Sequence, residues 1–481
     1  MSSAMKIGKK AFLLSVFIIL GLMVISGLLT LVLDAGEFER VRENGRTLVV
    51  EGTYHQVEKP DYPVWRCFTA PVEIIWSEGN VALITIILFI LCVGGAISIL
   101  EKVGIMEELV GLLVKRFSSR KYLLIALVIF FFMFTSSFIG VYEGMVPMIV
   151  FIVPLAISLG FDSLTGLGMS LLPMAFGFAS AVTNPFTIAV AQRIADLPLF
   201  SGALLRIVFF FVVYALVTLF VLRHAKKVEA DPSRSLSFAA DEALRAKLAS
   251  AGSRSVDAGA ASRRRGLVWF AVCVGLAMAM VFATARLPGL SDLAFPVMAL
   301  LFLVGGIGAG AFARVGGRRV TSAFFMGARD LLPGVVLILM AYSVKHIIVS
   351  GKIMDTILHA ASELIGGATP LAAAFLIYGT TLVMNFFIGS ASAKAFLMMP
   401  LLTPLADLVG ITRQTAVLAF DFGDGFSNMV FPTNALLLIA LSFTVVSYPV
   451  WMRWTWKLQL VMLGVTVAFL AFAVLIRFGP F

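Results

Sequence analysis

The sequence predicts an all-α polytopic membrane protein with two inverted repeats, each containing a re-entrant hairpin and a broken transmembrane helix. Three observations lead to this prediction: an apolar composition, a series of membrane-length apolar runs, and an internal repeat in a single register. Of the 481 residues, 60% are hydrophobic and only 13% are charged. A soluble domain carries roughly a quarter charged residues, so most of this chain must face lipid.

The net charge of +10 comes from basic clusters in short loops beside apolar runs. This is the positive-inside pattern of membrane proteins and not a nucleic-acid-binding face, so we expect contact with membrane lipid and none with nucleic acid. Lys6, Lys9 and Lys10 place the N-terminus in the cytoplasm, with the chain in a bacterial inner membrane. The other clusters expected in the cytoplasm lie within residues 115–121, 223–227, 263–265 and 314–319.

Seven apolar runs come close to the roughly 20 residues that a membrane-spanning helix needs. The first is interpreted as a retained membrane helix, because it is too long for a signal-peptide core and no cleavage site follows it. The seven runs are residues 11–33, 81–100, 202–222, 267–285, 293–312, 331–349 and 458–476.

Two polar segments divide the chain into regions. Residues 34–79 contain alternating polar and apolar positions and predict a small β-hairpin-like cap outside the membrane. Residues 226–265 are rich in Ala, Ser, Arg and Asp and predict a flexible cytoplasmic linker, with a short helix at residues 239–249. The predicted regions are the N-terminal helix 1–33, the cap 34–79, the first membrane repeat 80–225, the linker 226–265 and the second membrane repeat 266–481.

The internal repeat relates residues 120–196 to residues 370–448. Each region has two apolar arms around a small polar interruption, followed by an apolar run that a Thr-Asn pair breaks. One ungapped register aligns both features, and such internal repeats are the usual build of secondary transporters. Four matches share an offset of 250 residues: Pro154 with Pro404, Gly160 with Gly410, Phe176 with Phe426, and Thr183-Asn184 with Thr433-Asn434.

The predicted topology makes the two repeats inverted. With the N-terminus inside, the hairpin at residues 122–159 enters from the cytoplasm, and the hairpin at residues 371–409 enters from outside. Their tips would meet near the midplane. Non-helical backbone at that depth is tolerated only against protein or a water-filled cavity, so the tips and breaks predict a substrate site.

Four ionisable side chains fall in the tips and breaks: Glu143, Lys394, Asp421 and Asp424. A charge at the bilayer centre costs ~3 kcal/mol or more, so each needs a compensating role. Asp421 and Asp424 are three residues apart and share a helix face. Structural alternatives remain, since Glu143 could pair with another tip group and the flanking glycines could leave both aspartates in a solvated break. Lys394 either balances an acid or binds a carboxylate.

Uncharged polar side chains complete the predicted site. Asparagine caps broken helices, so a structural role is the alternative for the Thr-Asn pairs, but unwound backbone is also where transporters bind substrate or coupling ion. The predicted substrate-binding residues are Ser137, Glu143, Asn184, Ser390, Ser392, Lys394, Asp421, Asp424, Asn428 and Asn434. The residues predicted to hold a coupling ion, Na⁺ or H⁺, are Thr183, Asn184, Thr433 and Asn434.

Sequence patterns of enzymes are missing. The chain has no GxxxxGK[ST], HExxH or GxSxG stretch, which disfavours an ATP-driven pump and the corresponding proteases and lipases. We therefore expect no catalytic residues, no enzyme activity, no cofactor and no metal other than a coupling Na⁺.

The stretch from Ile411 to Asn428, which ends in Phe-Gly-Asp-Gly-Phe-Ser-Asn and is followed by Pro432-Thr433, resembles the anaerobic C4-dicarboxylate carrier family. Within that family it is similar to the YfcC-like branch of proposed basic amino acid antiporters, and residues 184–192 and 400–407 resemble it as well. The resemblance implies the ion transporter superfamily fold, an elevator-like homodimer, and carriage of amino acids or carboxylates.

Two departures from the family pattern fall at the predicted site. Residues 389–393 read Gly-Ser-Ala-Ser-Ala where relatives tend to carry Gly-Ser-Gly-Ser-Gly. Glu143 is followed by Gly144, whereas the first tip of relatives often carries paired acids. Both changes bear on the identity of the substrate.

The functional prediction is a secondary active transporter that exchanges a basic amino acid, of the arginine or ornithine type, by alternating access. Its physical basis is the excess of three acids over Lys394 alone at the tips and breaks. The alternative is an Na⁺- or H⁺-coupled carrier of C4-dicarboxylates or another carboxylate, in which Lys394 binds substrate and the acids bind the cation. An ion channel fits less well, because it needs a polar face through several spans.

Overall fold

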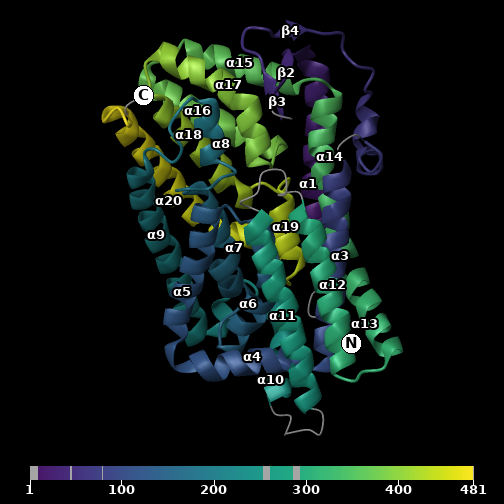
Figure 1. Cartoon of the computed structure of the whole chain (residues 1–481). Coiled ribbons are helices and arrows are strands. Elements are labelled where there is room, and N and C mark those ends of the chain that lie inside the picture. The colour runs from purple at the N-terminus through teal and green to yellow at the C-terminus, as the bar shows by residue number, and fades with distance from the viewer. Residues whose placement is uncertain (1–8, 44–45, 78–79, 253–259, 285–292, 480–481) are drawn as a thin grey trace.

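The computed structural model describes residues 9–43, 46–77, 80–252, 260–284 and 293–479. Within these ranges the chain is almost entirely helical, and ten helices are long and apolar enough to cross a membrane (Figure 1). Each of the seven predicted runs corresponds to one of them, which confirms a polytopic membrane protein. The ten are α1 (Lys9–Val32), α3 (Asn80–Val103), α5 (Lys121–Phe134) together with the helical turn that continues it to Ile139, α9 (Ala203–Ala230), α11 (Ala260–Thr284), α12 (Ala294–Phe312), α14 (Leu332–Ser350), α16 (Pro370–Phe387), α17 (Ala391–Val409) and α20 (Tyr448–Leu475).

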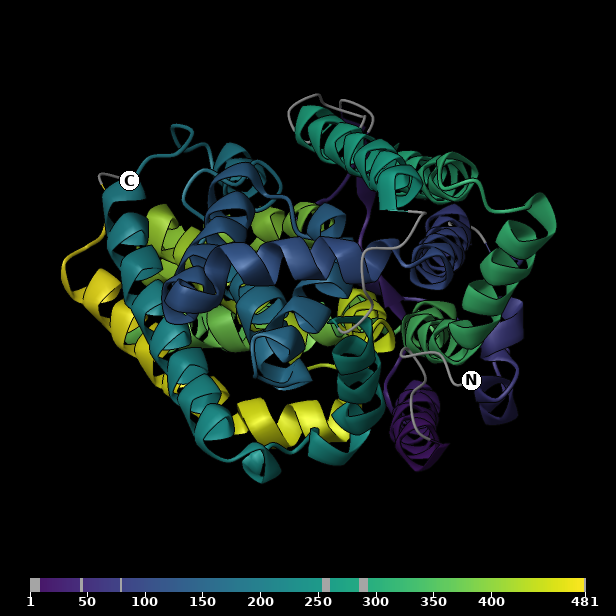
Figure 2. The ribbon, with the colours of Figure 1, turned by 90° about the horizontal axis from the view of Figure 1, so that it is seen from below.

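The helices form two bundles, which Figure 2 shows side by side from below. The helix α4 (Ile105–Phe117) runs between the bundles and contacts α3 and α11 on one side and α6 on the other. The smaller bundle comprises α1, α3, α11, α12, α13 (Gly317–Asp330) and α14. The larger bundle comprises α5, α6 (Ile149–Ser158), α7 (Ser163–Ala179), α8 (Ile188–Ile194), α9, α16, α17, α18 (Arg413–Phe426), α19 (Ala435–Ser442) and α20.

Each half of the chain contains a helical hairpin followed by an interrupted helix. In the first half, α5 and α6 are joined by a π-helical turn (Thr135–Ile139) and a 3-10 turn (Glu143–Met148), and in the second half a short tip joins α16 to α17. The interrupted helices are α7 with α8, and α18 with α19. These interruptions lie at the residues where the sequence predicts tips and breaks.

The two interrupted helices begin in the same way and in the predicted register. Gly160 and Gly410 both adopt left-handed backbone, with φ of 93° and 77°. Two residues later, Asp162 and Thr412 cap α7 and α18, each by accepting a hydrogen bond from the backbone N–H three residues further on. The equivalent local geometry follows from equivalent residue types, since glycine tolerates positive φ and Asp and Thr are good N-caps.

Residues that match in the repeat also meet in space. The rings of Phe176 and Phe426 contact each other, with centroids 5.3 Å apart. Next to them α18 approaches α7 so closely that a Cβ at Gly425 would lie 2.1 Å from the Cα of Ala179. A contact between equivalent residues is what a two-fold relation between two repeats produces.

A small β-structured cap follows α1, as predicted. The strand β2 (Arg40–Glu43) pairs antiparallel with β3 (Arg46–Val49), and β1 (Gly36–Glu37) pairs with β4 (His55–Gln56). The cap is attached to α15 (Met354–Gly366), where the buried Asp355 accepts from Arg40 at 2.7 Å and from the backbone N–H of Phe38 at 3.0 Å. The protein is therefore helical apart from this cap, within the part of the chain that the structure describes.

The short helix predicted at residues 239–249 is present, but the prediction that residues 226–252 form a flexible linker is wrong. The helix α9 continues to Ala230, and α10 (Phe238–Gly252) packs at the end of the molecule opposite the cap (Figure 1). The reason is a buried carboxylate: Asp241 accepts from the backbone N–H of Ser163 at 3.0 Å and from the hydroxyl of Ser237 at 2.7 Å. Burial raises the pKa of Asp241, because it outweighs these hydrogen bonds.

A second carboxylate ties the same region to α9 and α20. Asp162 accepts from the Ser235 hydroxyl at 2.5 Å and lies 2.9 Å from Nε2 of His224. The indole N–H of Trp454 lies 3.1 Å from Nδ1 of His224, and an indole can only donate. His224 therefore carries its hydrogen on Nε2, which it donates to Asp162.

Asp241→Ala is expected to release α10 from the start of α7. The change leaves the Ser163 N–H without its buried acceptor, and the loss of such a hydrogen bond costs about 1–3 kcal/mol. The check is amide hydrogen exchange of residues 238–252 in the purified protein, which should accelerate. Glu242→Ala is the matched control, because Glu242 is the exposed neighbour. Equal exchange in the two variants would contradict the docked arrangement.

Candidate functional site

A buried polar cluster forms where the second hairpin meets the second interrupted helix. Its centre is an ion pair between Lys394, in the first turn of α17, and Asp424, near the end of α18, and both side chains have 0% exposure. The Lys394 ammonium also donates to Oδ1 of Asn385 at the end of α16. The hairpin tip causes this meeting, since α16 ends at Phe387 and α17 begins at Ala391.

Amide side chains extend the cluster into the second break. The Nδ2 group of Asn385 lies 2.9 Å from the carbonyl oxygen of Asp424, 2.6 Å from the Ser427 hydroxyl and 3.0 Å from Oδ1 of Asn428. Asn434 donates to Oδ1 of Asn428 at 2.8 Å, while its own Oδ1 accepts from the first backbone N–H groups of α19. Asn434 thus has two roles, since it caps α19 and also donates a hydrogen bond within the cluster.

The structure adds a residue that sequence reasoning missed, Arg206 on α9. It is 2% exposed and interacts electrostatically with Asp421, three residues before Asp424. Both Asp421 oxygens lack a hydrogen bond of good geometry, although the Thr187 hydroxyl and the Ala181 backbone face them. An arginine inside the apolar run 202–222 was itself a signal, because a charge at membrane depth marks a partner or a site.

The charge count behind the sequence prediction needs correction. Lys394 pairs with Asp424, and Arg206 offsets Asp421, so each buried acid has its own cation. Three acids therefore do not face Lys394 alone.

In the first half, the tip and the break are tied to each other. The Ser137 hydroxyl donates to the Ser180 carbonyl at 2.5 Å, and Thr183 donates to the Phe138 carbonyl at 2.8 Å. Asn184 donates to the carbonyl of Ser136 at 3.3 Å. The predicted residues Ser137, Thr183 and Asn184 are therefore brought together, and their side chains bind backbone here.

One contact joins the two halves at their interruptions. Ser392, in the second tip, donates to the carbonyl of Phe186 in the first break at 2.9 Å. The neighbouring Ser390 is exposed and caps α17 by accepting from the backbone N–H of Ala393. Arg206, which lies in the first half like the first break, donates to the carbonyl of Val182 in that break at 3.2 Å.

Glu143 is not among the groups that the structure gathers around Lys394. Its side chain is exposed, and it interacts electrostatically with Tyr142 and with Tyr342 on α14. Thr433 is half-buried in the second break, and its hydroxyl has no hydrogen-bond partner among the described residues. The structure therefore joins four predicted residues directly or through Asn385: Lys394, Asp424, Asn428 and Asn434. Asp421, one helical turn before Asp424, interacts with it electrostatically.

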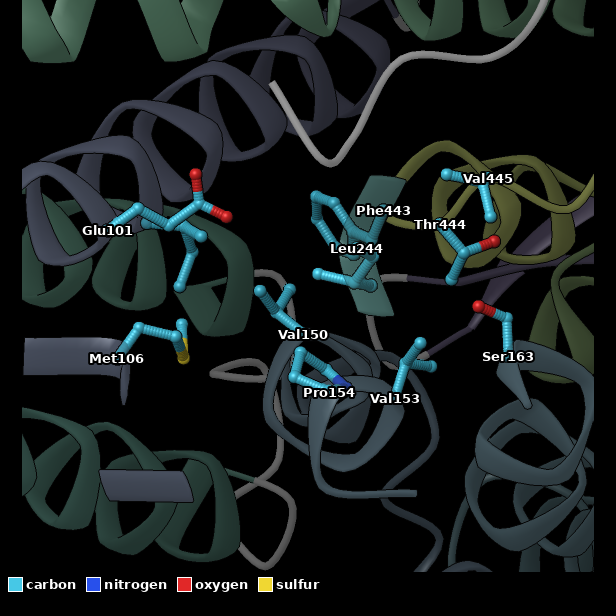
Figure 3. A pocket seen from close by; sticks show the side chains of 11 residues that line it. Glu101, Met106, Val150, Val153, Pro154, Ser163, Leu244, Phe443, Thr444 and Val445 are labelled. Atoms are coloured by element: carbon cyan, nitrogen blue, oxygen red, sulfur yellow. The ribbon is translucent and has the colours of Figure 1, made fainter. Parts of the chain in front are cut away.

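Figure 3 shows a small cavity apart from this cluster. It lies among α3, α4, α6, α10 and the segment after α19, and it has a volume of about 20 Å³, room for about one water molecule. Its lining includes none of the predicted site residues. The polar groups at its rim are Glu101, Ser163 and Thr444.

A family model decides the affiliation of this chain. The model of DcuC, the C4-dicarboxylate anaerobic carrier, matches residues 12–475. The chain belongs to this family. It is thus a multi-pass protein of a transporter family, whose substrates are small molecules.

This family member is also similar to two other bacterial proteins. It is 31% identical over 376 residues to an Escherichia coli protein named "Putative basic amino acid antiporter YfcC". The aligned residues make up 76% of this chain and 73% of that protein. It is 25% identical over 414 residues to an uncharacterized protein of Haemophilus influenzae, covering 85% and 78% of the two chains.

Two solved transporter structures align with nearly the full length of this chain, at low sequence identity and low structural similarity. The YdaH transporter of Alcanivorax borkumensis has 18% identity and a TM-score of 0.41, with 98% of this chain and 100% of that chain covered. MtrF of Neisseria gonorrhoeae, described within a class of antimetabolite efflux pumps, has 17% identity and a TM-score of 0.39, with 97% and 94% covered. Scores below 0.5 do not establish a shared fold.

Proposed function

We propose that this chain is a secondary active transporter that exchanges basic amino acids, such as arginine and ornithine, by alternating access. The observation that carries the proposal is the fully buried Lys394–Asp424 pair at the junction of a hairpin tip and a helix break. A cationic substrate can replace the Lys394 ammonium at Asp424 without leaving the buried carboxylate unpaired. The E. coli relative named as a basic amino acid antiporter supports this substrate class.

The remaining roles are assigned on position. Substrate would contact the polar groups that surround the pair in the second tip and break, and the Ser392 link would bring Ser137 and Asn184 of the first half within the same site. A coupling Na⁺ or H⁺ would bind at the two Thr-Asn breaks, Thr183-Asn184 and Thr433-Asn434. Glu143 would act from the first tip once the carrier changes conformation. No enzyme activity, cofactor or other metal is part of the proposal.

The proposed movement is elevator-like, with the larger bundle moving against the smaller one. The contact between the equivalent Phe176 and Phe426 supports two repeats related by a two-fold axis. Loop charges support inverted repeats with re-entrant hairpins, an N-terminus in the cytoplasm and a location in the bacterial inner membrane. We propose a homodimer on the family resemblance.

A carboxylate carrier is the second candidate, and Arg206 is the observation that favours it. Two buried cations, Arg206 and Lys394, lie next to the interrupted helices, where a dicarboxylate could bind both. The displaced acids, Asp421 and Asp424, would then take Na⁺ or H⁺. The name of the family, which refers to C4-dicarboxylates, agrees with this candidate.

Counterflow in proteoliposomes tests the proposal against this alternative. Vesicles loaded with unlabelled arginine, ornithine, succinate or aspartate are given the labelled compound outside, with and without a sodium gradient. Arginine or ornithine is expected to exchange, because each carries a cationic group that fits Asp424. Exchange of succinate without exchange of arginine would overturn the proposal and establish the carboxylate carrier.

A further inference from the structure

A cavity of about 300 Å³ lies between the cap and the second half of the chain, and none of its lining residues belongs to the cluster around Lys394. Its walls come from the cap (Phe38, Glu51, Tyr54), from α15 (His359, Glu363) and from α17 (Leu401). Figure 1 shows β3, α15 and α17 together at the end of the molecule opposite α10. Small-molecule sites have volumes of roughly 300–1,000 Å³, so this cavity admits a compound of amino acid size.

Aromatic rings form one wall of this cavity. The ring of Tyr54 stacks on that of His359 with centroids 4.0 Å apart, and Phe38 lies 5.4 Å from Tyr54. An aromatic face attracts an organic cation such as an ammonium or guanidinium group. A hydrogen bond between the hydroxyls of Tyr54 and Thr356, which are 3.0 Å apart, holds the Tyr54 ring in position.

Carboxylates and an apolar surface complete the lining. Glu51 and Glu363 are both exposed and line the cavity from the cap and from α15, respectively. The oxygen of Glu363 nearest to His359 lies 3.5 Å from its Nε2. Leu401 and Leu405 of α17 supply an apolar surface for an aliphatic stem. Two carboxylates, aromatic faces and aliphatic contacts together match an alkyl ammonium or alkyl guanidinium compound.

These acids are not needed to attach the cap. The cap is held through Arg40 and Asp355 at 2.7 Å, and through the hydrogen bond of the Thr356 hydroxyl to the carbonyl of Asp34 at 2.8 Å. Neither contact involves Glu51 or Glu363. The cavity therefore remains open beside a connection that is already made.

We propose that this cavity is a second binding site for an organic cation, distinct from the Lys394–Asp424 cluster. The inference deepens the proposed exchange of basic amino acids and rests on it for the identity of the natural ligand. The cavity would hold the cationic substrate beneath the cap before or after its passage through the central site. A cationic lipid headgroup has the same chemistry, and the experiment below separates the two sources.

Protection of a cysteine in the cavity from labelling by a maleimide reports whether the cavity is occupied and does not depend on transport. Ser362→Cys, a lining position, is combined with Asp424→Asn so that the central site is disabled, and the protein is placed in phosphatidylglycerol nanodiscs. Arginine and agmatine are each expected to slow labelling by a charged maleimide, whereas succinate should not. Glu51→Gln with Glu363→Gln should weaken this protection at least tenfold. Glu58→Gln, an exposed acid of the same cap, is the control and should change nothing.

The outcomes separate this site from the transport proposal. Protection by agmatine and arginine in the labelling experiment, together with no arginine counterflow in the protein that retains Asp424, would support the cavity and overturn the proposed function. No protection by either cation, equal protection after the Glu51 and Glu363 changes, or protection by succinate would overturn the cavity site. Slow labelling without added ligand, confined to phosphatidylethanolamine nanodiscs, would identify a lipid headgroup as the occupant and overturn the amino acid assignment.

Discussion

Asp424→Asn is expected to lower the exchange rate about a hundredfold or more, while the protein still reaches the membrane. The change removes one partner of a fully buried pair and leaves Lys394 without its counter-charge. Losing one partner of a buried charge pair costs about 2–5 kcal/mol of ligand binding, and each ~1.4 kcal/mol corresponds to a factor of ten. The measurement is counterflow in proteoliposomes with reconstituted protein quantified in each sample.

Two further variants make this result interpretable. Asp407→Asn is the matched control, since Asp407 lies on α17 and pairs with Arg413 at the surface. It should leave exchange unchanged, because exposed pairs contribute at most about 1 kcal/mol. Lys394→Gln separates the two candidate functions: arginine should still bind at Asp424, whereas a dicarboxylate would lose its cationic contact. Full exchange in the Asp424→Asn protein would refute the assignment of the pair to the site.

Arg206→Leu is expected to destabilise the folded protein by about 3–5 kcal/mol, because it leaves the carboxylate of Asp421 buried without a cation. The double variant Arg206→Leu with Asp421→Asn should recover most of that loss, since no buried charge remains. The check is the temperature at which the detergent-solubilised protein loses its monodisperse peak.

Arg223→Leu serves as the comparison for this result, because Arg223 is an exposed arginine on the same helix. Its melting temperature should stay close to that of the unmodified protein. If Asp421→Asn failed to rescue Arg206→Leu, the two side chains would not be energetically coupled, and the hydrogen bonds of Arg206 to the first break would explain its burial instead.

The helices and their interruptions could be predicted from the sequence, because they depend on local features. Apolar length identifies a span, and the shared register of Gly160 with Gly410 identifies equivalent helix starts. The pairing of Lys394 with Asp424 was within reach as well, since both lie in interruptions of the second half. Orientation in the membrane and the inverted relation of the repeats stay predictions.

What the sequence did not reveal depends on neighbours that are distant in the chain. Arg206 lies in an apolar run that resembles any other membrane span. Only the packing of α9 against α18 places it close enough to Asp421 to interact electrostatically. The segment after α9 has the composition of a linker, yet Asp241 fixes it by capping a helix 78 residues earlier in the chain. Glu143 was placed by its tip position alone, but the structure leaves its side chain exposed and outside the cluster around Lys394.

The balance of the buried charges has a consequence for how voltage acts on the proposed carrier. Lys394 pairs with Asp424, and Arg206 offsets the charge of Asp421 electrostatically. The four charges sum to zero, so these groups transfer no charge when the empty site crosses the membrane. A monovalent substrate adds one charge, and each charge is worth about 2.3 kcal/mol per 100 mV. Arginine and ornithine moving in opposite directions cancel this term, so concentration gradients alone set the direction of their exchange. A doubly charged amine exchanged for arginine would be drawn inward by the negative interior of the cell.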